Sequence, residues 1–522
     1  EAQRRSKLRS CGRRAGRLMR MVPAATVLPV LFISPVRAAE WQAHPSISFS
    51  EFYTDNVSLA PAGAATSSWV TQVRPQITLT YNGNNFKFSA SYAAEFLYHS
   101  DSQDLTINNI FSGGTLGSME LVPQILFLDT NSNVSQYNNS LSGPLATNNI
   151  NTTGNRNTVR TTTISPYIRD NFGLEAELLA RFSYSFVSSD APGSIDSTTP
   201  AVDVRLTSGP AWRLTTWGLQ YTRRTEKTED FIPDNTFENV TFNVKRLITY
   251  NLALVGSVGY DNNSYQAIRG VDTKGASWSA GINWTPTPRT NLTATYGRKY
   301  YGPSGYLQFN HRTGYTVWNA SYSETVTTTN AQFLVPTQGN TATILDALFL
   351  PTIPDPVLRQ QAVRDFIAQQ GLPSTLIVPV NFVTNQVFLA KTWQGSVGIQ
   401  YPRHSVFANL YSTTSETQTP GLPGGAGDFN ANNTVKQAGT SLIWNWRVSP
   451  FDSANASIGY SRNEFPTSGR DDHLKYLRLS LSHQFSPRMT GSLSYQRLNS
   501  DSNQAGSSYT ENQVQAQVGV SF

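Results

Sequence analysis

Apolar and polar residues alternate along most of the chain. Over 86–98 the even positions carry Phe86, Phe88, Ala90, Tyr92, Ala94, Phe96 and Tyr98, and most residues between them are polar. The same period of two recurs over 174–186, 252–260 and 477–485. Successive side chains of a strand point to opposite faces, so the pattern predicts β-strands with one apolar and one polar face.

The pattern predicts about 22 strands, with 20 to 24 as the expected range. Their ranges are 44–54, 68–81, 85–98, 104–121, 125–137, 158–169, 173–187, 199–208, 214–227, 237–248, 251–262, 276–285, 290–300, 304–311, 314–328, 384–401, 405–415, 433–448, 453–462, 472–485, 489–499 and 509–522.

The connections between these strands alternate in length. Short turns lie at 82–85, 122–124, 170–173, 208–212, 285–290, 311–313, 401–405, 449–452 and 486–488. Long polar loops lie between them, at 138–157, 188–198, 228–236, 263–275 and 416–432. Short turns at one end and long loops at the other are typical of outer-membrane barrels.

A sheet in lipid must close on itself, because an open edge leaves backbone N–H and C=O groups without partners. An even number of strands puts both termini on the periplasmic, short-turn side. About 22 strands of about 10 residues need roughly 220 residues inside the bilayer, which this chain supplies. The predicted fold class is therefore all-β: a transmembrane, antiparallel, up-and-down β-barrel over 39–522, surrounded by the lipid of a bacterial outer membrane.

One insertion, at about 329–383, breaks the period of two. Asp355 suits a helix N-cap, Pro356 the first helical position and Gly371 the stop, which predicts one short amphipathic helix. The helix either caps the loops or folds into the lumen as a constriction or gate. The residues of this candidate gate helix are Asp355, Arg359, Arg364, Phe366, Ile367 and Gly371.

Charged residues at alternating strand positions are candidates for the lumen face. A charge facing lipid costs about 2–4 kcal/mol at the bilayer midplane, which favours an inward position. Such residues either form a structural charge ladder or line a hydrophilic path. The lumen candidates are Glu95, Glu175, Glu177, Arg181, Arg223, Lys245, Arg298 and Arg478.

The net charge of +6 comes from the first 38 residues. These hold nine of the 40 basic residues and one of the 34 acidic residues, so 31 basic and 33 acidic residues follow them. This balance excludes a nucleic-acid-binding function. A basic segment, the apolar stretch 21–36 and a small-residue site predict a signal peptide over 1–38, cleaved after Ala38. A retained anchor is the alternative.

The cysteine, histidine and glycine residues of the chain indicate no catalytic or ligand-binding site. The single cysteine, Cys11, lies within the predicted signal peptide, which excludes disulfides, thiolate metal sites and covalent haem in the mature chain. The six histidines are scattered, and no glycine motif for nucleotides is present. "GDFNANN" at 427–433 suits a solvated turn better than a calcium loop. We predict no catalytic, metal or cofactor-binding residues, no cofactor and no enzymatic activity.

Four stretches carry a family resemblance: "PSISFSEFYTDNVSL" (45–59), "ELVPQILFLDTNSNVSQ" (120–136), "PDPVLRQQAVRDFIAQQGLPSTL" (354–376) and "TNQVFLAKTWQGS" (384–396). They resemble the outer-membrane β-barrel family associated with the PEP-CTERM protein-sorting and exopolysaccharide system of Gram-negative bacteria. The resemblance implies a barrel that accompanies exopolysaccharide production, with polysaccharide and periplasmic export components as partners. It implies no catalytic residues.

The last strand has a further expected role. Resemblance to outer-membrane proteins implies that the barrel-assembly machinery reads an aromatic residue at its end during insertion. The predicted assembly signal is the apolar face Val514, Ala516, Val518, Val520 and Phe522.

Three functions fit these observations. The first is a conduit or scaffold for exopolysaccharide export. The second is a general or gated porin for small solutes. The third is the barrel sheath of an electron-transfer conduit, which depends on a multihaem partner because the predicted mature chain has no cysteine of its own.

Overall fold

The computed structural model describes residues 41–100, 108–190, 196–228, 233–334, 345, 353, 355–356, 359–360, 362–363, 384, 386–420, 428–430 and 432–522. Residues from Trp41 onward form one compact unit. The predicted signal peptide 1–38 and its cleavage site at Ala38 lie outside the described residues.

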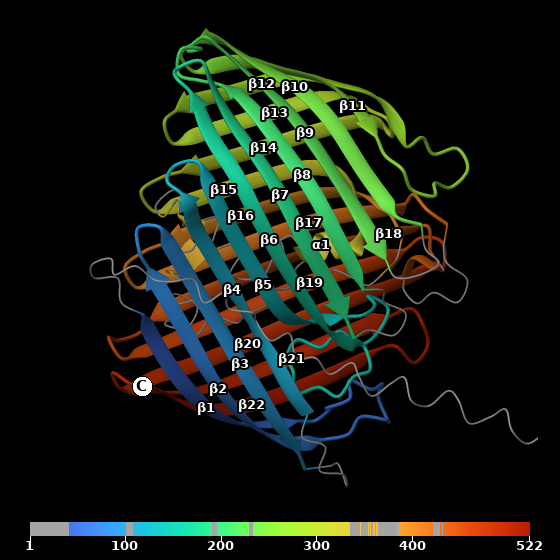
Figure 1. The fold of residues 1–522 in the computed structure, drawn as a ribbon. Helices are drawn as coiled ribbons and strands as arrows, with labels where there is room; N and C mark the ends of the chain where they lie inside the picture. Colours follow the sequence, from blue (N-terminus) through green and yellow to red (C-terminus); the bar gives the residue numbers. More distant parts are fainter. Residues whose placement is uncertain are drawn as a thin grey trace, which may run out of the picture. The chain divides into compact units, whose positions relative to one another are not determined.

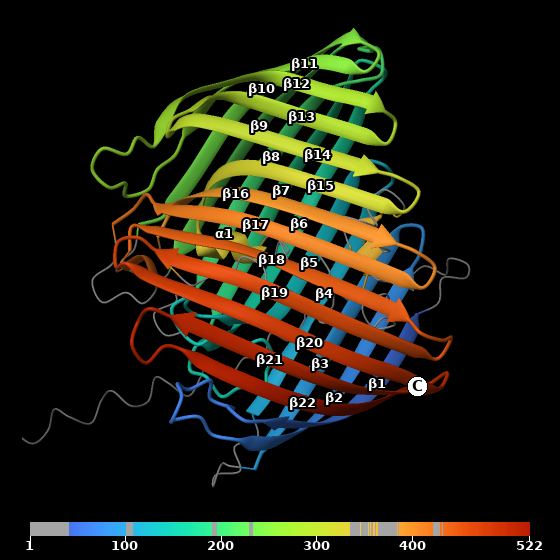
Figure 2. The same ribbon diagram turned by 180° about the vertical axis from the view of Figure 1, so that it is seen from behind.

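The unit is a closed barrel of 22 antiparallel strands (Figures 1 and 2). The strands are β1 (Gln42–Thr54), β2 (Ser68–Asn82), β3 (Phe86–His99), β4 (Asn108–Val122), β5 (Leu126–Asn138), β6 (Arg156–Phe172), β7 (Ala176–Ser189), β8 (Ser197–Ser208), β9 (Thr215–Thr228), β10 (Asn235–Thr249), β11 (Leu252–Asn262), β12 (Lys274–Thr287), β13 (Thr290–Lys299), β14 (Gly302–Arg312), β15 (Thr316–Thr327), β16 (Phe388–Gln400), β17 (His404–Thr417), β18 (Thr434–Arg447), β19 (Asp452–Phe465), β20 (Arg470–Ser486), β21 (Met489–Ser502) and β22 (Tyr509–Ser521). The predicted fold class and strand number are confirmed.

Each strand pairs with the strands before and after it in the chain, and β1 pairs with β22 to close the barrel. At this seam Ile47 lies opposite Val520 and Phe49 opposite Val518. Ile47 and Phe49 are 42% and 53% exposed although they are apolar. Exposed apolar side chains at every second position mark the lipid-facing surface, and the residues between them face the lumen.

The two ends of the barrel differ, as predicted. Phe522 and short connections such as 83–85 and 173–175 lie at one end, which we call the turn end. Gly173 has φ +59° there, a left-handed conformation that glycine adopts without steric cost. The long connections, including 139–155 and the insertion between β15 and β16, lie at the opposite loop end. The connection between β13 and β14 is also at the loop end but spans only 300–301.

Helical structure occurs in the insertion. Helix α1 (Thr329–Leu334) begins it and was not predicted. Within the predicted helix, the described residues Pro356, Arg359, Gln360, Ala362 and Val363 are helical. The backbone N of Arg359 donates to the carbonyl of Asp355, 2.9 Å away. Arg364, Phe366, Ile367 and Gly371 lie outside the described residues. A short 3-10 helix, η1 (Asp428–Asn430), precedes β18. No helix among the described residues is long and apolar enough to cross a membrane.

Candidate lumen constriction

The connection between β5 and β6, residues 139–155, folds into the barrel instead of extending away from it. We call it the inward loop. Its apolar residues Leu141, Leu145 and Ile150 are 1%, 7% and 1% exposed. Each packs into a different apolar cluster on the inner wall. Three anchors at intervals of four and five residues hold the loop across the lumen.

The first anchor lies against β16, β18 and β19. Leu141 packs there with Phe388, Val435 and Phe465. The carboxylate of Asp428 in η1 accepts a hydrogen bond from the Leu141 backbone N, 2.7 Å away. Its other oxygen accepts from the Ser140 hydroxyl at 2.6 Å. A polar clamp therefore holds the start of the inward loop beside its apolar anchor.

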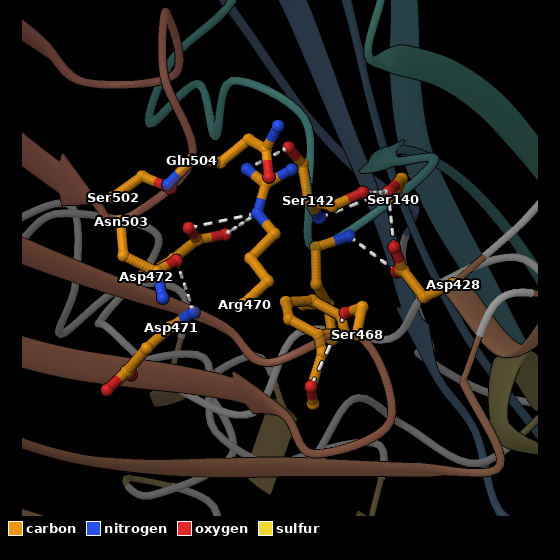
Figure 3. A network of polar contacts seen from close by, with 12 residues as sticks. Ser140, Ser142, Asp428, Ser468, Arg470, Asp471, Asp472, Ser502, Asn503 and Gln504 are labelled. Carbon is orange, nitrogen blue, oxygen red and sulfur yellow. Dashed lines mark hydrogen bonds and ion pairs between the residues drawn. The ribbon is translucent and has the colours of Figure 1, made fainter.

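The second anchor lies against β20, β21 and β22, and Figure 3 shows the polar contacts of Arg470, Asp472 and Ser142 beside it. Leu145 packs with Leu474, Leu498 and Tyr509, and its backbone N donates to the Tyr509 hydroxyl oxygen at 2.9 Å. Arg470 forms an ion pair with Asp472, with Nε and a carboxylate oxygen 2.8 Å apart. The same guanidinium donates to the Ser142 carbonyl at 2.7 Å.

A cavity of about 210 Å³ lies beside this second anchor. It is lined by 141–145 of the inward loop, by 58–61 of the connection between β1 and β2, and by wall residues that include Arg470, Asp472 and Tyr509.

The third anchor lies against β1, β2 and β3. Ile150 packs with Phe52, Val70 and Leu97, and its carbonyl accepts a hydrogen bond from His99 Nε2 at 2.8 Å. The neighbouring amide of Asn149 donates to Glu95 at 2.7 Å. Glu95 also forms an ion pair with Arg74, with atoms 3.2 Å apart.

Glu511 on β22 fastens the end of the inward loop. Its side chain is fully buried, and one carboxylate oxygen accepts from the Thr54 hydroxyl at 2.8 Å and from the Asn151 amide at 2.7 Å. Nearby, Asn148 donates to Gln513 at 2.7 Å. Arg156 at the base of the loop donates to the Asn148 carbonyl and to the Asn149 side chain. Burying these charges is tolerated because each has hydrogen-bond partners.

The opposite wall holds α1. Phe333 packs on Val159 of β6 and Val187 of β7, and its ring lies 4.8 Å from that of Tyr137. Glu226 of β9 accepts hydrogen bonds from Thr328 at 2.6 Å and from Asn330 at 2.9 Å. Figures 1 and 2 both show α1 enclosed by the strands. Two segments therefore enter the lumen from the loop end, on different sides.

The described part of the predicted helix also contacts the lumen wall. The carboxylate of Asp355 pairs with Lys87, which lies on the inward face of β3 two residues after the 83–85 turn. Arg359 is 8% exposed, and its guanidinium donates to the Ile353 carbonyl at 3.0 Å. The insertion starts at the loop end, so the contact with Lys87 at the turn end favours the alternative in which this segment enters the lumen.

Five predicted lumen residues lie on inward faces. Glu95 contacts the inward loop, as above. Arg181 pairs with Asp129 at 2.9 Å and lies 4.1 Å from the centre of the Tyr167 ring. Lys245 donates to Asn283 at 2.8 Å, and Arg478 contacts Gln515 at 3.5 Å. Glu177 shares the inward face of β7 with Arg181.

Three predicted lumen residues are corrected. Glu175 lies in the exposed turn before β7, not on a strand. Arg223 and Arg298 lie on the outer face: Arg223 is opposite Val202, which is 36% exposed, and Arg298 is opposite Trp278, which is 52% exposed. Both lie near the loop ends of their strands. The cost of a lipid-facing charge falls to about 0–1 kcal/mol near the interfaces, so these positions tolerate it.

Several inward charges were missed by the sequence analysis. They are Arg74, Asp129, Arg156, Arg224, Glu226 and Glu511. For Arg224 a signal existed, because Trp217, Leu219 and Tyr221 put the apolar face of β9 on odd positions. The Arg224 guanidinium lies 4.6 Å from the centre of the inward Phe237 ring. For Glu511, nothing local shows that a loop 360 residues away supplies its partner Asn151.

The predicted assembly signal lies on the outer face of β22. Val514 and Val518 are 45% and 40% exposed, and Phe522 is 65% exposed. Ala516 and Val520 share their face, and Gln513, Gln515 and Gln517 face the lumen. The backbone N of Phe522 donates to the Pro45 carbonyl at 2.9 Å, which continues the ladder one residue beyond β22.

The buried tyrosines at the loop end do not titrate near neutral pH. Burial raises the pKa of Tyr301, in the connection between β13 and β14, to about 12, and burial also raises the pKa of Tyr265. Both hydroxyls therefore stay neutral at physiological pH. Among the described residues, no group of three or more His, Cys, Asp or Glu side chains is arranged to hold a metal ion.

Among the comparisons with known proteins, only the comparison with solved structures found similar proteins. No protein-family model and no curated protein matches the chain. The ferric enterobactin receptor PfeA of Pseudomonas aeruginosa is 10% identical, with a TM-score of 0.47, covering 92% of this chain and 81% of that chain. The ferric-catecholate import receptor Fiu of E. coli is 11% identical, with a TM-score of 0.46, covering 94% and 82%. OccK2 of P. aeruginosa is 8% identical, with a TM-score of 0.35, covering 92% and 98%.

The architecture of the barrel indicates the cellular location of the protein. A closed antiparallel barrel with an outward apolar face and short turns at one end is the architecture of bacterial outer-membrane proteins. The chain is therefore an integral protein of the bacterial outer membrane.

Proposed function

We propose that this barrel is an outer-membrane conduit for a neutral, hydroxyl-rich polymer, and that it serves exopolysaccharide export linked to the PEP-CTERM system. The link to that system rests on the sequence resemblance. We infer that the polymer is neutral from the side chains that line the inner wall, above all those on the inner face of β5, β6 and β7.

A track of uncharged polar groups runs along this inner face. Ser165 and Ser183 share a hydrogen bond of 2.8 Å, and Thr163 and Ser185 one of 2.9 Å. Asn133 donates to Ser135 at 2.8 Å nearer the loop end. Hydroxyl and amide groups both donate and accept hydrogen bonds, so they can exchange these contacts for contacts with successive sugar hydroxyls.

An aromatic platform lies at the turn end of this track. The rings of Phe127 and Tyr167 stack with centroids 5.0 Å apart and an interplanar angle of 14°. Arg181 covers Tyr167 and pairs with Asp129. Flat rings beside a paired cation and carboxylate suit the apolar face and the hydroxyl edge of a sugar ring. This platform and its polar track are the observation that carries the proposal.

The test combines a deletion strain with purified protein. We expect loss of surface exopolysaccharide in the deletion strain, restored by the wild-type gene but restored poorly by a Phe127→Ala/Tyr167→Ala variant. A variant with alanine at the outward Leu128 and Ile168 is the matched control, because it removes apolar groups from the same two strands without touching the lumen. Normal exopolysaccharide without the gene, together with no conductance in planar bilayers, would contradict the proposal.

A gated porin for small solutes is the second candidate, favoured by the inward loop that narrows the lumen. Liposome swelling with sugars of graded size separates the two functions. Rapid swelling with monosaccharides that stays unaffected by the platform substitutions would favour the porin. The barrel-assembly machinery is the expected partner during insertion in both cases, and periplasmic export components are expected only for the conduit.

A further inference from the structure

The outer face carries an unbalanced group of cations near the loop end of β9 to β13. We call it the basic patch, and its cations are Arg223, Lys274 and Arg298. All three side chains are exposed. Arg223 lies five residues before the end of β9, Lys274 is the first residue of β12, and Arg298 is one residue before the end of β13. All three are therefore at the level where the strands leave the hydrocarbon core on the long-loop side.

A polar row across four strands links the first two cations. Arg223 lies opposite Glu238 of β10, and Lys274 lies opposite Asn262 of β11. The Asn262 amide donates to Glu238 at 2.9 Å, and the Tyr221 hydroxyl donates to the other Glu238 oxygen at 2.8 Å. Each Glu238 oxygen thus accepts one hydrogen bond, one from Asn262 and one from Tyr221. Glu238 is the one carboxylate placed in the row between Arg223 and Lys274.

Five other outer-face cations near the loop end are neutralised, whereas Arg497 of β21 contacts the Asn512 side chain at 3.5 Å. On the outer face near the loop end, Arg160 pairs with Asp190 at 2.9 Å, Arg462 with Asp471 at 2.6 Å and Lys475 with Asp501 at 3.2 Å. Lys391 pairs with Glu416 at 3.0 Å and Lys436 with Glu464 at 3.5 Å. Within the described part of the chain, no carboxylate lies within 4.0 Å of the cationic groups of Arg223, Lys274 or Arg298.

Apolar and aromatic side chains lie on the same face, next to the patch toward the turn end. Trp278 lies directly opposite Arg298, and Tyr296 follows on the same face of β13. Trp278, Tyr296 and Val258 are 52%, 64% and 59% exposed. Acyl chains would contact these side chains, while the headgroup of the same lipid would lie at the level of the cations.

We propose that the basic patch binds the phosphate groups of a phosphorylated glycolipid of the outer leaflet. Phosphate oxygens accept charge-assisted hydrogen bonds from guanidinium and ammonium groups, and Arg223 and Arg298 each offer a planar fork for this purpose. The acyl chains lie along Trp278 and Tyr296. The site is separate from the lumen and does not depend on the proposed conduit function.

The test measures binding of bisphosphorylated lipid A to the folded protein in zwitterionic micelles by native mass spectrometry. The variant is Arg223→Gln/Lys274→Gln/Arg298→Gln. The matched control is Arg160→Gln/Arg462→Gln/Lys475→Gln, which removes three cations from the same rim and changes the net charge equally. Both proteins are first shown to be folded by their heat-modifiable migration. If the triple variant does not fold, Lys274→Gln alone replaces it, because that residue begins its strand.

We expect the patch variant to bind lipid A about tenfold more weakly than wild type and the control variant to stay within about twofold. Lipid A stripped of both phosphates should bind wild type as weakly as lipid A binds the patch variant. An equal loss in the control variant would show general electrostatic attraction and overturn the proposal. Equal binding of dephosphorylated lipid, or displacement of lipid A by millimolar inorganic phosphate, would overturn it as well.

Discussion

At the scale of single residues, adjacent positions on one strand have opposite surroundings. Arg223 faces outward at the rim, and Arg224 faces the lumen beside Phe237. Both are arginine, so residue type cannot distinguish them. The distinction comes from the apolar neighbours Leu219 and Tyr221, which share the outward face with Arg223. The parity of the apolar residues in a strand is therefore a better guide to the lumen than the presence of a charge.

Glu511 provides a residue-scale prediction. One of its oxygens accepts the hydrogen bonds from Thr54 and Asn151, and the other, Oε2, has no partner among the described residues. Glu511→Ala leaves two buried donors unsatisfied and should destabilise the anchored inward loop by about 2 kcal/mol. Glu511→Gln keeps an oxygen acceptor and should stay near wild type. The midpoint of heat-modifiable migration measures both, and a Gln variant as unstable as the Ala variant would show that the charge, not the hydrogen bonds, matters.

At the scale of elements, each strand has one lipid face and one lumen face. Phe242 and its neighbour Asn243 on β10 test this arrangement, because Phe242 is 40% exposed on the outer face and Asn243 faces inward. Phe242→Arg should reduce the free energy of unfolding by about 2–4 kcal/mol, whereas Asn243→Arg should have a small effect. Reversible denaturation in lipid vesicles measures the difference. Equal costs at the two positions would refute the assigned faces.

The inward loop is the element that most changes the lumen. Replacing 141–154 by a short Gly-Ser turn removes all three apolar anchors, so we expect conductance in planar bilayers to rise several-fold. Replacing the exposed connection 503–508 in the same way is the control and should leave conductance at the wild-type value. If the shortened barrel folds and conducts as wild type does, the inward loop does not limit the path.

At the scale of the whole molecule, closure joins β1 to β22 across the full length of the chain. The seam runs from Ser46 opposite Ser521 to Thr54 opposite Gln513. This pairing leaves no open edge in lipid. It also brings Thr54 and Glu511 together, so the site that fastens the inward loop exists only in the closed barrel.

Phe522 gives a prediction at this scale. Its side chain is exposed on the outer face, and its ladder bond to Pro45 is made by the backbone, which a substitution keeps. Phe522→Ala should therefore reduce the amount of heat-modifiable barrel in the outer membrane, while the purified variant refolds in micelles as wild type does. Leu493→Ala, at an outward position of β21 that is 57% exposed, is the control. Unchanged amounts in the membrane would contradict an assembly role.

The sequence by itself determined the elements. Period-two patterning and the lengths of the connections predicted the barrel class, the 22 strands and the two different ends, because a strand in lipid must show one apolar face and pair both its edges. The same pattern located the outward residues of β22 and the inward Glu95, Arg181 and Lys245. All of these features follow from the order of neighbouring residues along the chain, which the sequence contains.

Only the tertiary structure decided what fills the lumen. The polar loop 138–157 has the composition of a solvated surface loop, and its three large apolar residues, Leu141, Leu145 and Ile150, look incidental in the sequence. Their partners on β1–β3, β16, β18–β22 and η1 are distant in the chain, so neither propensity nor periodicity could show that the loop folds inward. The parity of the neighbouring apolar residues already indicates that Arg223 and Arg298 face outward. Only the closed barrel sets their depth in the bilayer, on which the cost of a lipid-facing charge depends.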